Sequence, residues 1–276
     1  MWRLLGHAKH KSMKIAVISD IHGNLPALQA VLADIDRANI TNIINLGDTL
    51  GGPLESARTA DLLMQRQIPM IAGNHERQLL TFPPEKLNRS DTCTASEISP
   101  AHRAWLTEAP ETMWLSDDLF ACHGTPSSDL QYWLETITAD FGLNGSPGMR
   151  AATSTEIIHR LGKGVHTDKA SLILCGHTHV PRVMTVQIVN AKQKSRDITI
   201  VNPGSVGLPA YDDIHPYKHF VETGSPHARY AVVQKTATSW KTNLCSVSYD
   251  FESMACLAEH RNRPDWAIAL RTGRMK

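Results

Sequence analysis

Five short apolar segments of this chain each end in a polar cluster that contains Asp, Asn or His, usually beside glycine. The first segment, residues 14–19, reads KIAVIS, a β-branched run that is typical of a strand buried on both faces. In open α/β sheets, functional sites form at the edge where the carboxyl ends of the strands lie. The pattern therefore predicts an α/β fold with polar side chains gathered at one edge of a sheet.

Hydrophobic spacing predicts alternating strands and helices in the first part of the chain. Apolar residues recur at helical spacing from Leu28 to Ile35, and Asn24 and Pro26 suit the start of that helix. Strands are predicted at 42–46 and 68–72, with a helix over 53–66 between them. This β-α-β-α-β order predicts parallel strands with right-handed crossovers.

Shorter strands and one insertion are predicted in the later part. The predicted strands are 112–115, 119–122, 172–175, 183–189, 197–201, 230–234 and 241–247, and the predicted helices are 100–108, 128–136, 151–161 and 249–261. Glycines punctuate residues 125–170, which we interpret as a lid-like insertion that covers one face. We expect the domain to span 13–263, with a disordered extension at 1–12 that lacks the features of a signal peptide and a flexible tail at 264–276.

The polar clusters at the strand ends offer a mixed set of metal ligands. They read Asp20-Ile21-His22-Gly23-Asn24, Gly47-Asp48, Gly73-Asn74-His75-Glu76, His123-Gly124 and Gly176-His177-Thr178-His179. Any one of them is more often a turn or a helix cap. Together they supply carboxylates, an amide and imidazoles, a nitrogen and oxygen set that suits borderline divalent metals. The set contains no thiolate, which argues against a structural zinc site.

These five blocks, in this order, resemble the motifs of the calcineurin-like metallophosphoesterase superfamily. The family pattern is Asp-x-His, Gly-Asp, Gly-Asn-His-Glu/Asp, a single His and Gly-His-x-His. Residues 202–207, Asn-Pro-Gly-Ser-Val-Gly, are similar to the small bacterial and archaeal branch described as YfcE-like or diadenosine-tetraphosphatase-like. The resemblance implies a four-layer αββα sandwich of two mixed β-sheets flanked by helices.

The resemblance also implies a site for two divalent metal ions. It assigns the first ion to Asp20, His22, Asp48 and His179, and the second to Asp48, Asn74, His123 and His177, so that Asp48 bridges the two. Manganese is the leading candidate, and iron, zinc, cobalt and nickel also suit such ligands.

The implied reaction is hydrolysis of a small organic phosphate, with a phosphodiester or a nucleotide favoured. Metal-bound hydroxide attacks phosphorus, and His75 protonates the leaving group as general acid. Asp48 and Glu76 are both candidates to orient His75. The backbone N–H groups of 204–207 are candidates for anion binding, so Gly204, Ser205 and the nearby Tyr211 are proposed substrate contacts; a plain turn is the alternative.

Three other functions stay open. A protein Ser/Thr phosphatase uses arginines to clamp phosphate, and here Arg77 is a weak candidate for that role. A nuclease is disfavoured because 28 basic and 27 acidic residues leave a formal charge of +1, too little for long nucleic acid. A non-catalytic scaffold of the same fold is disfavoured because the ligand residues and His75 are all retained.

Composition restricts location and partners. No apolar run approaches the ~18–20 residues of a membrane span. Five cysteines without a CxxC pair favour a reducing compartment, so we expect a cytoplasmic protein with a small phosphorylated substrate as its partner. In the insertion, we expect Tyr132 and Trp133 to fill the core of the lid rather than to stack on a nucleobase. The isolated His219 is expected at the surface.

Overall fold

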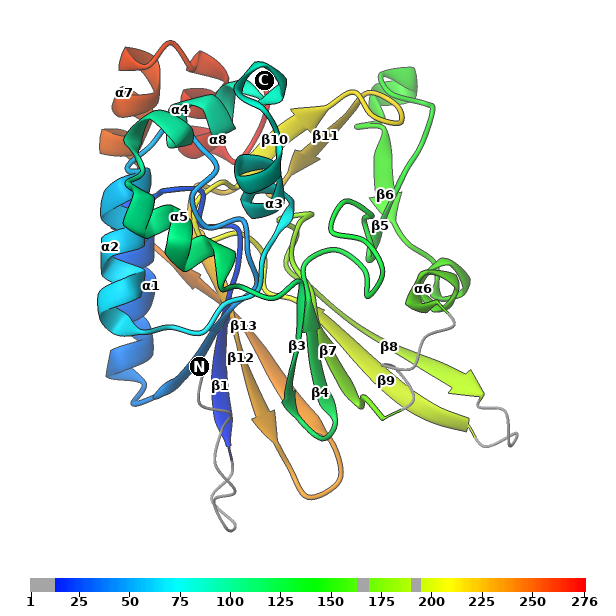
Figure 1. Ribbon diagram of the computed structural model, residues 1–276. Helices are drawn as coiled ribbons and strands as arrows, with labels where there is room; N and C mark the ends of the chain where they lie inside the picture. The colour runs from blue at the N-terminus through cyan, green and yellow to red at the C-terminus, as the bar shows by residue number, and fades with distance from the viewer. Residues whose placement is uncertain (1–12, 163–168, 190–194) are drawn as a thin grey trace.

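The computed structural model describes residues 13–162, 169–189 and 195–276. Two mixed β-sheets lie face to face in the lower half of the view in Figure 1. The first sheet has the order β13-β12-β1-β2, formed by β1 (Lys14–Ile18), β2 (Asn42–Asn45), β12 (Ala228–Lys235) and β13 (Trp240–Val247). Strand β1 runs parallel to β2 and antiparallel to β12, which makes this sheet mixed.

The second sheet has the order β3-β4-β7-β9-β8. Its strands are β3 (Thr112–Ser116), β4 (Leu119–Cys122), β7 (Leu172–Leu174), β8 (Arg182–Val189) and β9 (Ser195–Asn202). Strand β7 runs parallel to both β4 and β9, whereas the β3–β4 and β8–β9 pairs are antiparallel. Ile15 and Val17 of the first sheet pack against Leu174 and Val201 of the second, so the main strands are buried between the layers as the apolar runs predict.

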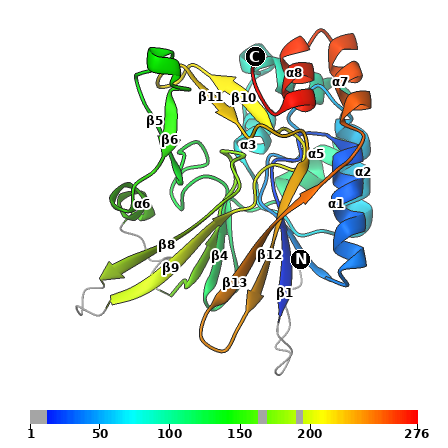
Figure 2. The ribbon, with the colours of Figure 1, turned by 180° about the vertical axis from the view of Figure 1, so that it is seen from behind.

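Helices cover both outer faces. Helices α1 (Leu25–Arg37), α2 (Ser56–Arg66) and α5 (Pro100–Thr107) pack in one apolar cluster with Ala16 and Tyr230 of the first sheet. Helix α6 (Ser154–Leu161) packs on the other side, against Ile173 and Ile200 of the second sheet. Figures 1 and 2 show the resulting order of helix, sheet, sheet and helix, which confirms the expected αββα sandwich.

The remaining elements gather above the carboxyl ends of β1 and β2 (Figure 1). They are α3 (Asn74–Thr81), α4 (Arg89–Glu97), α7 (Phe251–His260), α8 (Pro264–Thr272), the hairpin β10 (Ala210–Asp213) and β11 (His219–Glu222), the hairpin β5 (Glu135–Ile137) and β6 (Met149–Ala151), and 3-10 turns at Pro84–Lys86 and Leu143–Gly145. This end of the molecule therefore holds the polar loops and the surfaces that surround them.

The expected strand at 68–72 is wrong. The segment runs beside β2 but makes a single parallel bridge, between Met70 and Asn45. Pro69 has no N–H group and cannot donate to a ladder, so only its carbonyl is used, by the N–H of Asn45.

The expected helix at 128–136 is also wrong, because residues 135–137 form β5 and pair with β6. The β-branched side chains of Thr136 and Ile137 suit this strand. The expected helix at 151–161 appears as α6. Part of the predicted insertion, residues 163–168, lies outside the described residues.

Residues 264–276, expected to be a flexible tail, contain helix α8 instead. Pro264 occupies its first turn, and Trp266 and Leu270 lie one turn apart on its buried face. They pack with Leu54, Leu208 and α7 in one apolar cluster. Residues 1–12, expected to be disordered, lie outside the described residues.

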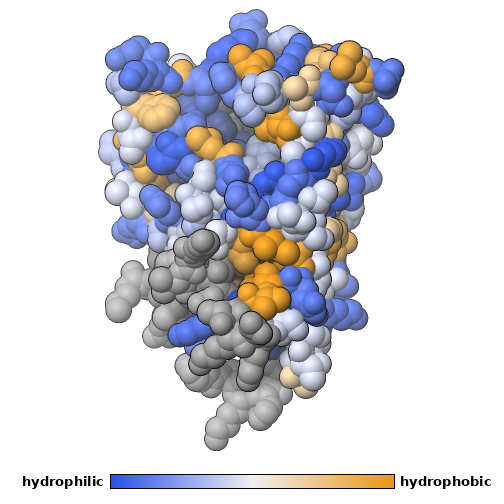
Figure 3. Space-filling view, turned by 90° about the vertical axis from the view of Figure 1, so that its right-hand side faces the viewer, coloured by the Kyte–Doolittle hydropathy of each residue, from blue (hydrophilic) through white to orange (hydrophobic). Residues whose placement is uncertain are grey.

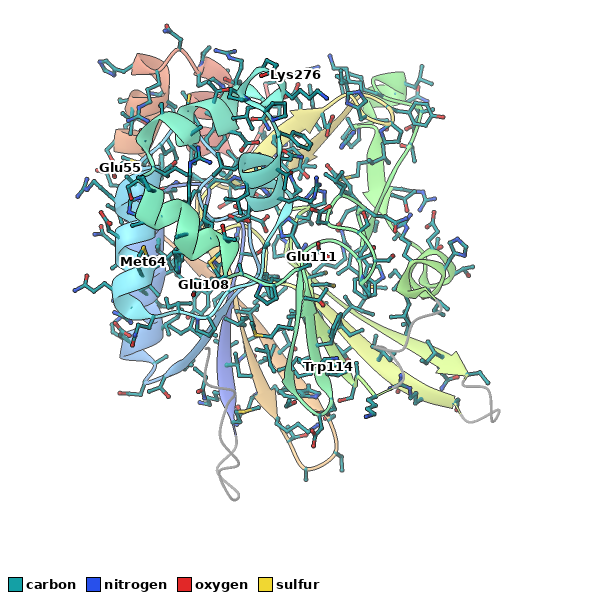
Figure 4. All side chains as sticks on the ribbon, in the orientation of Figure 1. Glu55, Met64, Glu108, Glu111, Trp114 and Lys276 are labelled. Carbon is teal, nitrogen blue, oxygen red and sulfur yellow. The ribbon has the colours of Figure 1, made fainter. Side chains whose placement is uncertain are left out.

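The surface is mostly hydrophilic on the face that Figure 3 shows, with hydrophobic atoms gathered at mid-height. Trp114 of β3, labelled in Figure 4, packs its ring against that of Phe120, with the ring centroids 5.1 Å apart. Among the helices of the described ranges, none combines the length and the apolar content needed to cross a bilayer.

Candidate metal centre

Six of the predicted metal-binding side chains meet in two groups at the carboxyl ends of the strands. Asp20, His22 and His179 form one group, and Asp48, His123 and His177 form the other. Within each group the candidate ligand atoms all lie within 4.8 Å of one another. The groups are adjacent, because His123 Nε2 lies 3.1 Å from Asp48 Oδ2 and 4.0 Å from Asp20 Oδ1.

The seventh predicted ligand, Asn74, reaches the second group from the first turn of α3. In the orientation that satisfies its neighbours, its side-chain amide donates to His177 Nδ1 at 3.0 Å and to Asp48 Oδ2 at 3.2 Å. The structure therefore brings together all seven side chains that the sequence assigned to metal ions.

Each of the four imidazoles in these groups has one ring nitrogen against a backbone carbonyl. The pairs are His22 Nδ1 with Gly51 O at 2.6 Å, His123 Nδ1 with Leu46 O at 2.7 Å, His177 Nε2 with Leu130 O at 3.0 Å and His179 Nδ1 with Leu208 O at 2.6 Å. A carbonyl only accepts hydrogen bonds, so the facing nitrogen carries the proton and donates. In the neutral ring the other nitrogen is then a bare lone pair, the arrangement found in metal-binding histidines.

These lone pairs point at one another. His22 Nε2 lies 3.1 Å from His179 Nε2, and the latter lies 3.4 Å from Asp20 Oδ1. Acceptors that converge in this way repel unless a cation or a proton lies among them. Because the side chains of the two groups offer imidazole nitrogens and carboxylate oxygens, with the Asn74 amide beside the second group, the residues present fit borderline divalent metals in both groups.

Burial lowers the pKa of two of these imidazoles, whereas neighbouring carboxylates raise the pKa of a third. Burial, aided by His179, lowers the pKa of His22 to about 3, and burial, aided by His123, lowers that of His177 to about 4. Burial also acts to lower the pKa of His123, but the charges of Asp48 and Asp20 outweigh it and raise the pKa to about 10. Without a metal, His123 therefore holds a proton at neutral pH.

Metal binding is accordingly expected to release protons. His123 must lose its proton to bind a metal, and its pKa of about 10 means that this proton is present at pH 8. Below pH 10 the metal affinity should rise about tenfold per pH unit for each proton released. Calorimetric titration with Mn²⁺ in two buffers of different ionisation enthalpy measures the number of protons; identical heats in both buffers would contradict this.

The backbone is strained where the ligands stand. Nine non-glycine residues in the described ranges have positive φ, and five of them are Asp20, His22, Asp48, His177 and His179, with φ between 51° and 67°. This region is unfavourable for residues with a Cβ and persists only where the surrounding structure enforces it. Such strain concentrates at functional sites, which is consistent with a role for these loops beyond stability.

Glu76 ties two of these loops together. Its carboxylate accepts the backbone N–H groups of Asp48, Thr49 and Gly73, each at 2.8 Å. A Cβ at Gly73 would lie 2.2 Å from Asp48 Oδ1, so only glycine fits at this crossing. Glu76 is thus a structural support for Asp48 and belongs to neither candidate metal group.

Loss of this support should destabilise the fold. Replacing the buried Glu76 with Ala leaves three N–H groups without a partner, at about 1–3 kcal/mol each. We expect the free energy of unfolding to fall by about 3 kcal/mol or more, measured by urea denaturation. The exposed Glu108→Ala variant is the matched control, and an equal effect of both changes would refute the role of Glu76.

His75 is oriented by a residue that the sequence did not indicate. Its Nδ1 lies 2.6 Å from Asp91 Oδ1, and Asp91 Oδ2 accepts the side-chain amide of Asn88 at 2.7 Å. Asp48 accepts only the backbone N–H of His75, and Glu76 is engaged elsewhere, so neither expected candidate orients the ring. Asp91 was missed because its only local signal is an Asn-x-x-Asp helix start, which says nothing about His75.

Negative charge raises the pKa of His75. Burial acts to lower this pKa, but Asp48 and the hydrogen bond to Asp91 outweigh burial and raise it to about 9. His75 remains outside both metal groups and lines the cleft above them. It therefore carries a proton at neutral pH, next to the space where a ligand would lie.

The expected anion-binding loop at 204–207 is wrong. Its polar groups are used internally: Gly204 N–H donates to Asn202 Oδ1 at 2.8 Å, and Gly207 N–H donates to Asp20 O at 3.0 Å. Ser205 is buried, and its hydroxyl donates to Asp20 O at 2.7 Å. The loop supports the strand end that carries Asp20, and Gly204 and Ser205 do not line the cleft.

Tyr211, the third proposed substrate contact, does line the cleft. Its hydroxyl donates to His177 O at 3.1 Å and lies 2.7 Å from the hydroxyl of Tyr132. Tyr132 in turn lies 3.0 Å from His219 Nε2, and His219 is buried rather than at the surface as expected. The insertion and the β10–β11 hairpin thus meet at the loop of His177.

The surroundings of Trp133 and of Arg77 test two further expectations. Trp133 is buried in the core beneath α6, and its indole N–H donates to Ile157 O at 3.1 Å, so the core interpretation is confirmed. Arg77, the candidate phosphate clamp, is bound through two nitrogens to Asp129 at 2.6 and 3.1 Å and does not line the cleft that holds His75. This pairing weakens the argument for a protein phosphatase.

Comparison with known proteins agrees with this geometry. Residues 13–223 match the profile of the calcineurin-like phosphoesterase superfamily domain. A segment of 70 residues, 25% of this chain and 28% of the relative's length, is 44% identical to an uncharacterised protein of Methanocaldococcus jannaschii. A metallophosphoesterase from Sphaerobacter thermophilus has a similar structure, with a TM-score of 0.65, 21% identity and coverage of 95% of this chain and 100% of that one. YfcE, a phosphoesterase from E. coli, gives a TM-score of 0.38 at 18% identity, with 86% and 100% covered.

Proposed function

The chain belongs to the calcineurin-like phosphoesterase superfamily, and we propose that it is a phosphodiesterase that works with two divalent metal ions, manganese being the first to test. Asp20, His22 and His179 would hold one ion, and Asn74, His123 and His177 the other, with Asp48 shared between them. Two metal ions, when bound, neutralise the charge of a phosphate and activate water as a nucleophile at neutral pH.

A single observation carries this proposal. Four imidazoles, each with one ring nitrogen against a backbone carbonyl, converge with two buried carboxylates and one side-chain amide in two adjacent groups. A scaffold that needed only to fold would bury so many ionisable groups at a cost, because the hydrogen bonds among them offset only part of their desolvation. Two metal ions explain the arrangement at once.

The chain's own residues supply the proton and its orientation. His75 lines the cleft with a pKa of about 9, so its ring holds a proton that it can give to a leaving oxygen. Asp91 accepts the Nδ1–H of this ring at 2.6 Å and fixes its rotation, which leaves Nε2 as the donor. The alkoxide that forms would otherwise leave as a strong base.

The direct test is hydrolysis of bis-(4-nitrophenyl) phosphate and of 4-nitrophenyl phosphate. The protein is first treated with a chelator and then supplied with Mn²⁺. We expect activity that depends on added metal and a higher kcat/KM for the diester. A protein that binds two equivalents of Mn²⁺ but hydrolyses neither ester would be a scaffold, and a preference for phosphoserine peptides would indicate a protein phosphatase.

A further inference from the structure

The candidate metal centre opens into a cleft far larger than a phosphate group. The cleft has a volume of about 810 Å³ and begins at His22, His177 and His179. Its lining includes residues of helix α8 and of the β10–β11 hairpin, two elements that lie at the top of Figures 1 and 2. Clefts of ~300–1,000 Å³ take whole small molecules, so the part of a substrate beyond its phosphate has room here.

One wall of this cleft is built by residues beyond 223, where the match to the family profile ends. The ring of Trp266 in α8 lies edge-on to the ring of His22, with the ring centroids 6.0 Å apart. The Trp266 ring also packs closely on Gly52, where an added Cβ would lie 2.7 Å from the indole. The chain then ends beside the hairpin, where Lys276, labelled in Figure 4, lies over the ring of Phe220 at 5.2 Å. Helix α8 thus lies beside the candidate metal centre, and the last residue of the sequence packs against the hairpin.

The lining of the cleft away from the metal ligands is largely apolar. Leu130 and Ile137 come from the insertion, Leu208 precedes the hairpin, and Ala269 and Met275 come from the chain's last segment. Apolar groups of a ligand that pack against these side chains would be removed from water. This burial favours binding by ~25 cal/mol per Å² of apolar surface.

The charged side chains of the same lining do not suit a second phosphate. Besides His75 and the candidate metal ligands, the ionisable lining residues with an acidic, guanidinium or imidazole group are Arg89, Arg263, Asp212, Asp213, His215 and Asp265 in the described ranges. Arg263 is bound to Asp265 at 2.6 Å, and Arg89 donates to Asn262 O at 2.8 Å, so the three carboxylates of this lining outnumber its two guanidinium groups. Arginine or lysine in excess of carboxylates would favour a second phosphate here, whereas an excess of carboxylates repels it.

We propose that this cleft selects a substrate with one phosphoryl group and an uncharged, largely apolar alcohol part, and disfavours substrates with a second phosphate. The inference rests on the proposed function, because the single phosphoryl group is the one held at the metal centre. It narrows the substrate class: simple diesters and esters of bulky neutral alcohols fit, and compounds with a polyphosphate chain do not.

The test uses phosphonates, which are not hydrolysed and therefore report binding alone. Methylphosphonate, hexylphosphonate and hexane-1,6-diphosphonate are titrated calorimetrically into the Mn²⁺-loaded protein. Hexylphosphonate should bind at least about tenfold more tightly than methylphosphonate, because its added methylene groups lie against apolar walls. The diphosphonate should bind at least about fivefold more weakly than hexylphosphonate, because its second charge faces the carboxylates.

Asp212→Lys tests the charge argument directly. Asp212 is exposed on β10, so a lysine there is compatible with the fold. The variant should reduce the preference for hexylphosphonate over the diphosphonate at least about fivefold. Asp117→Lys makes the same change in net charge at the exposed β3–β4 turn, outside the cleft, and should leave both dissociation constants as they are.

The outcomes separate this inference from the proposed function. Equal or tighter binding of the diphosphonate, no gain from the hexyl chain, or no binding of any of the three would overturn the inference. If the diester assay succeeds and the binding order fails, the function stands and the inference falls. If the binding order holds but no ester is hydrolysed, the cleft selects as proposed and the catalytic function is wrong.

Discussion

Asp48→Asn is expected to abolish the function by removing metal from both groups at once. Asp48 contacts His123 at 3.1 Å, and its other oxygen accepts the N–H of His75 at 2.9 Å. The side chain is nearly the same size, so the fold should persist while the negative charge between the two groups is lost. Loss of a supporting contact at a metal site costs ~10–100-fold, and loss of a shared ligand should cost more, about a thousandfold in kcat/KM.

Metal analysis after gel filtration shows whether the Asp48→Asn variant loses activity because it loses metal ions. Wild type should retain two equivalents of Mn²⁺, and the Asp48→Asn variant fewer than one. Asp36→Asn, at an exposed ion pair with Arg66, provides the control for loss of a carboxylate and should retain both ions. Full double occupancy in the Asp48→Asn protein would show that this residue does not bridge.

His75→Ala is expected to slow hydrolysis in proportion to the basicity of the leaving group. An alkoxide needs a proton as it departs, whereas nitrophenolate is stable without one. General acid catalysis is worth ~10²–10⁴-fold, so the variant should lose most of that factor on an alkyl diester and much less on a nitrophenyl diester. Both metal ions should stay bound, because His75 lies outside the two groups.

Two related variants define the role of this proton. Asp91→Asn should reproduce part of the His75→Ala loss on the alkyl diester, because the ring loses the acceptor at 2.6 Å that holds its orientation. His123→Ala should weaken metal binding and slow both esters together. If His75→Ala slows both classes of ester equally at saturating metal, or loses a metal ion, then His75 is a ligand or a positioning residue.

The candidate metal ligands were predictable because each belongs to a short polar motif that is recognisable in the sequence. A buried strand shows as a run of apolar residues, and Asp20, Asp48, His123 and His177 each follow such a run. Parallel pairing brings the ends of β1 and β2 together in one sheet and those of β4 and β7 in the other, and the packing of the two sheets brings the two pairs together. The same local patterns predicted the two sheets and most of their strands.

Local patterns failed where a long-range contact decides the structure. The tail beyond 263 is polar enough to suggest disorder, yet α8 is stable because Trp266 and Leu270 find an apolar surface made by Leu54 and Leu208. Residues 204–207 carry the composition of an anion-binding turn, yet the N–H groups of Val206 and Gly207 donate to the carbonyls of Ser19 and Asp20, and that of Gly204 donates to Asn202 Oδ1.

The sequence by itself thus indicated the αββα fold and the seven candidate metal ligands, because the five short blocks that carry the family resemblance each lie within a few residues of a predicted strand end. The tertiary structure alone decided that Asp91 holds His75, that Glu76 supports Asp48 and that α8 and the β10–β11 hairpin enclose the cleft. These partners come from helices and loops with no fixed relation along the chain. Their meeting depends on how the outer elements pack over the two sheets, and that packing is governed by total apolar burial rather than by any local motif.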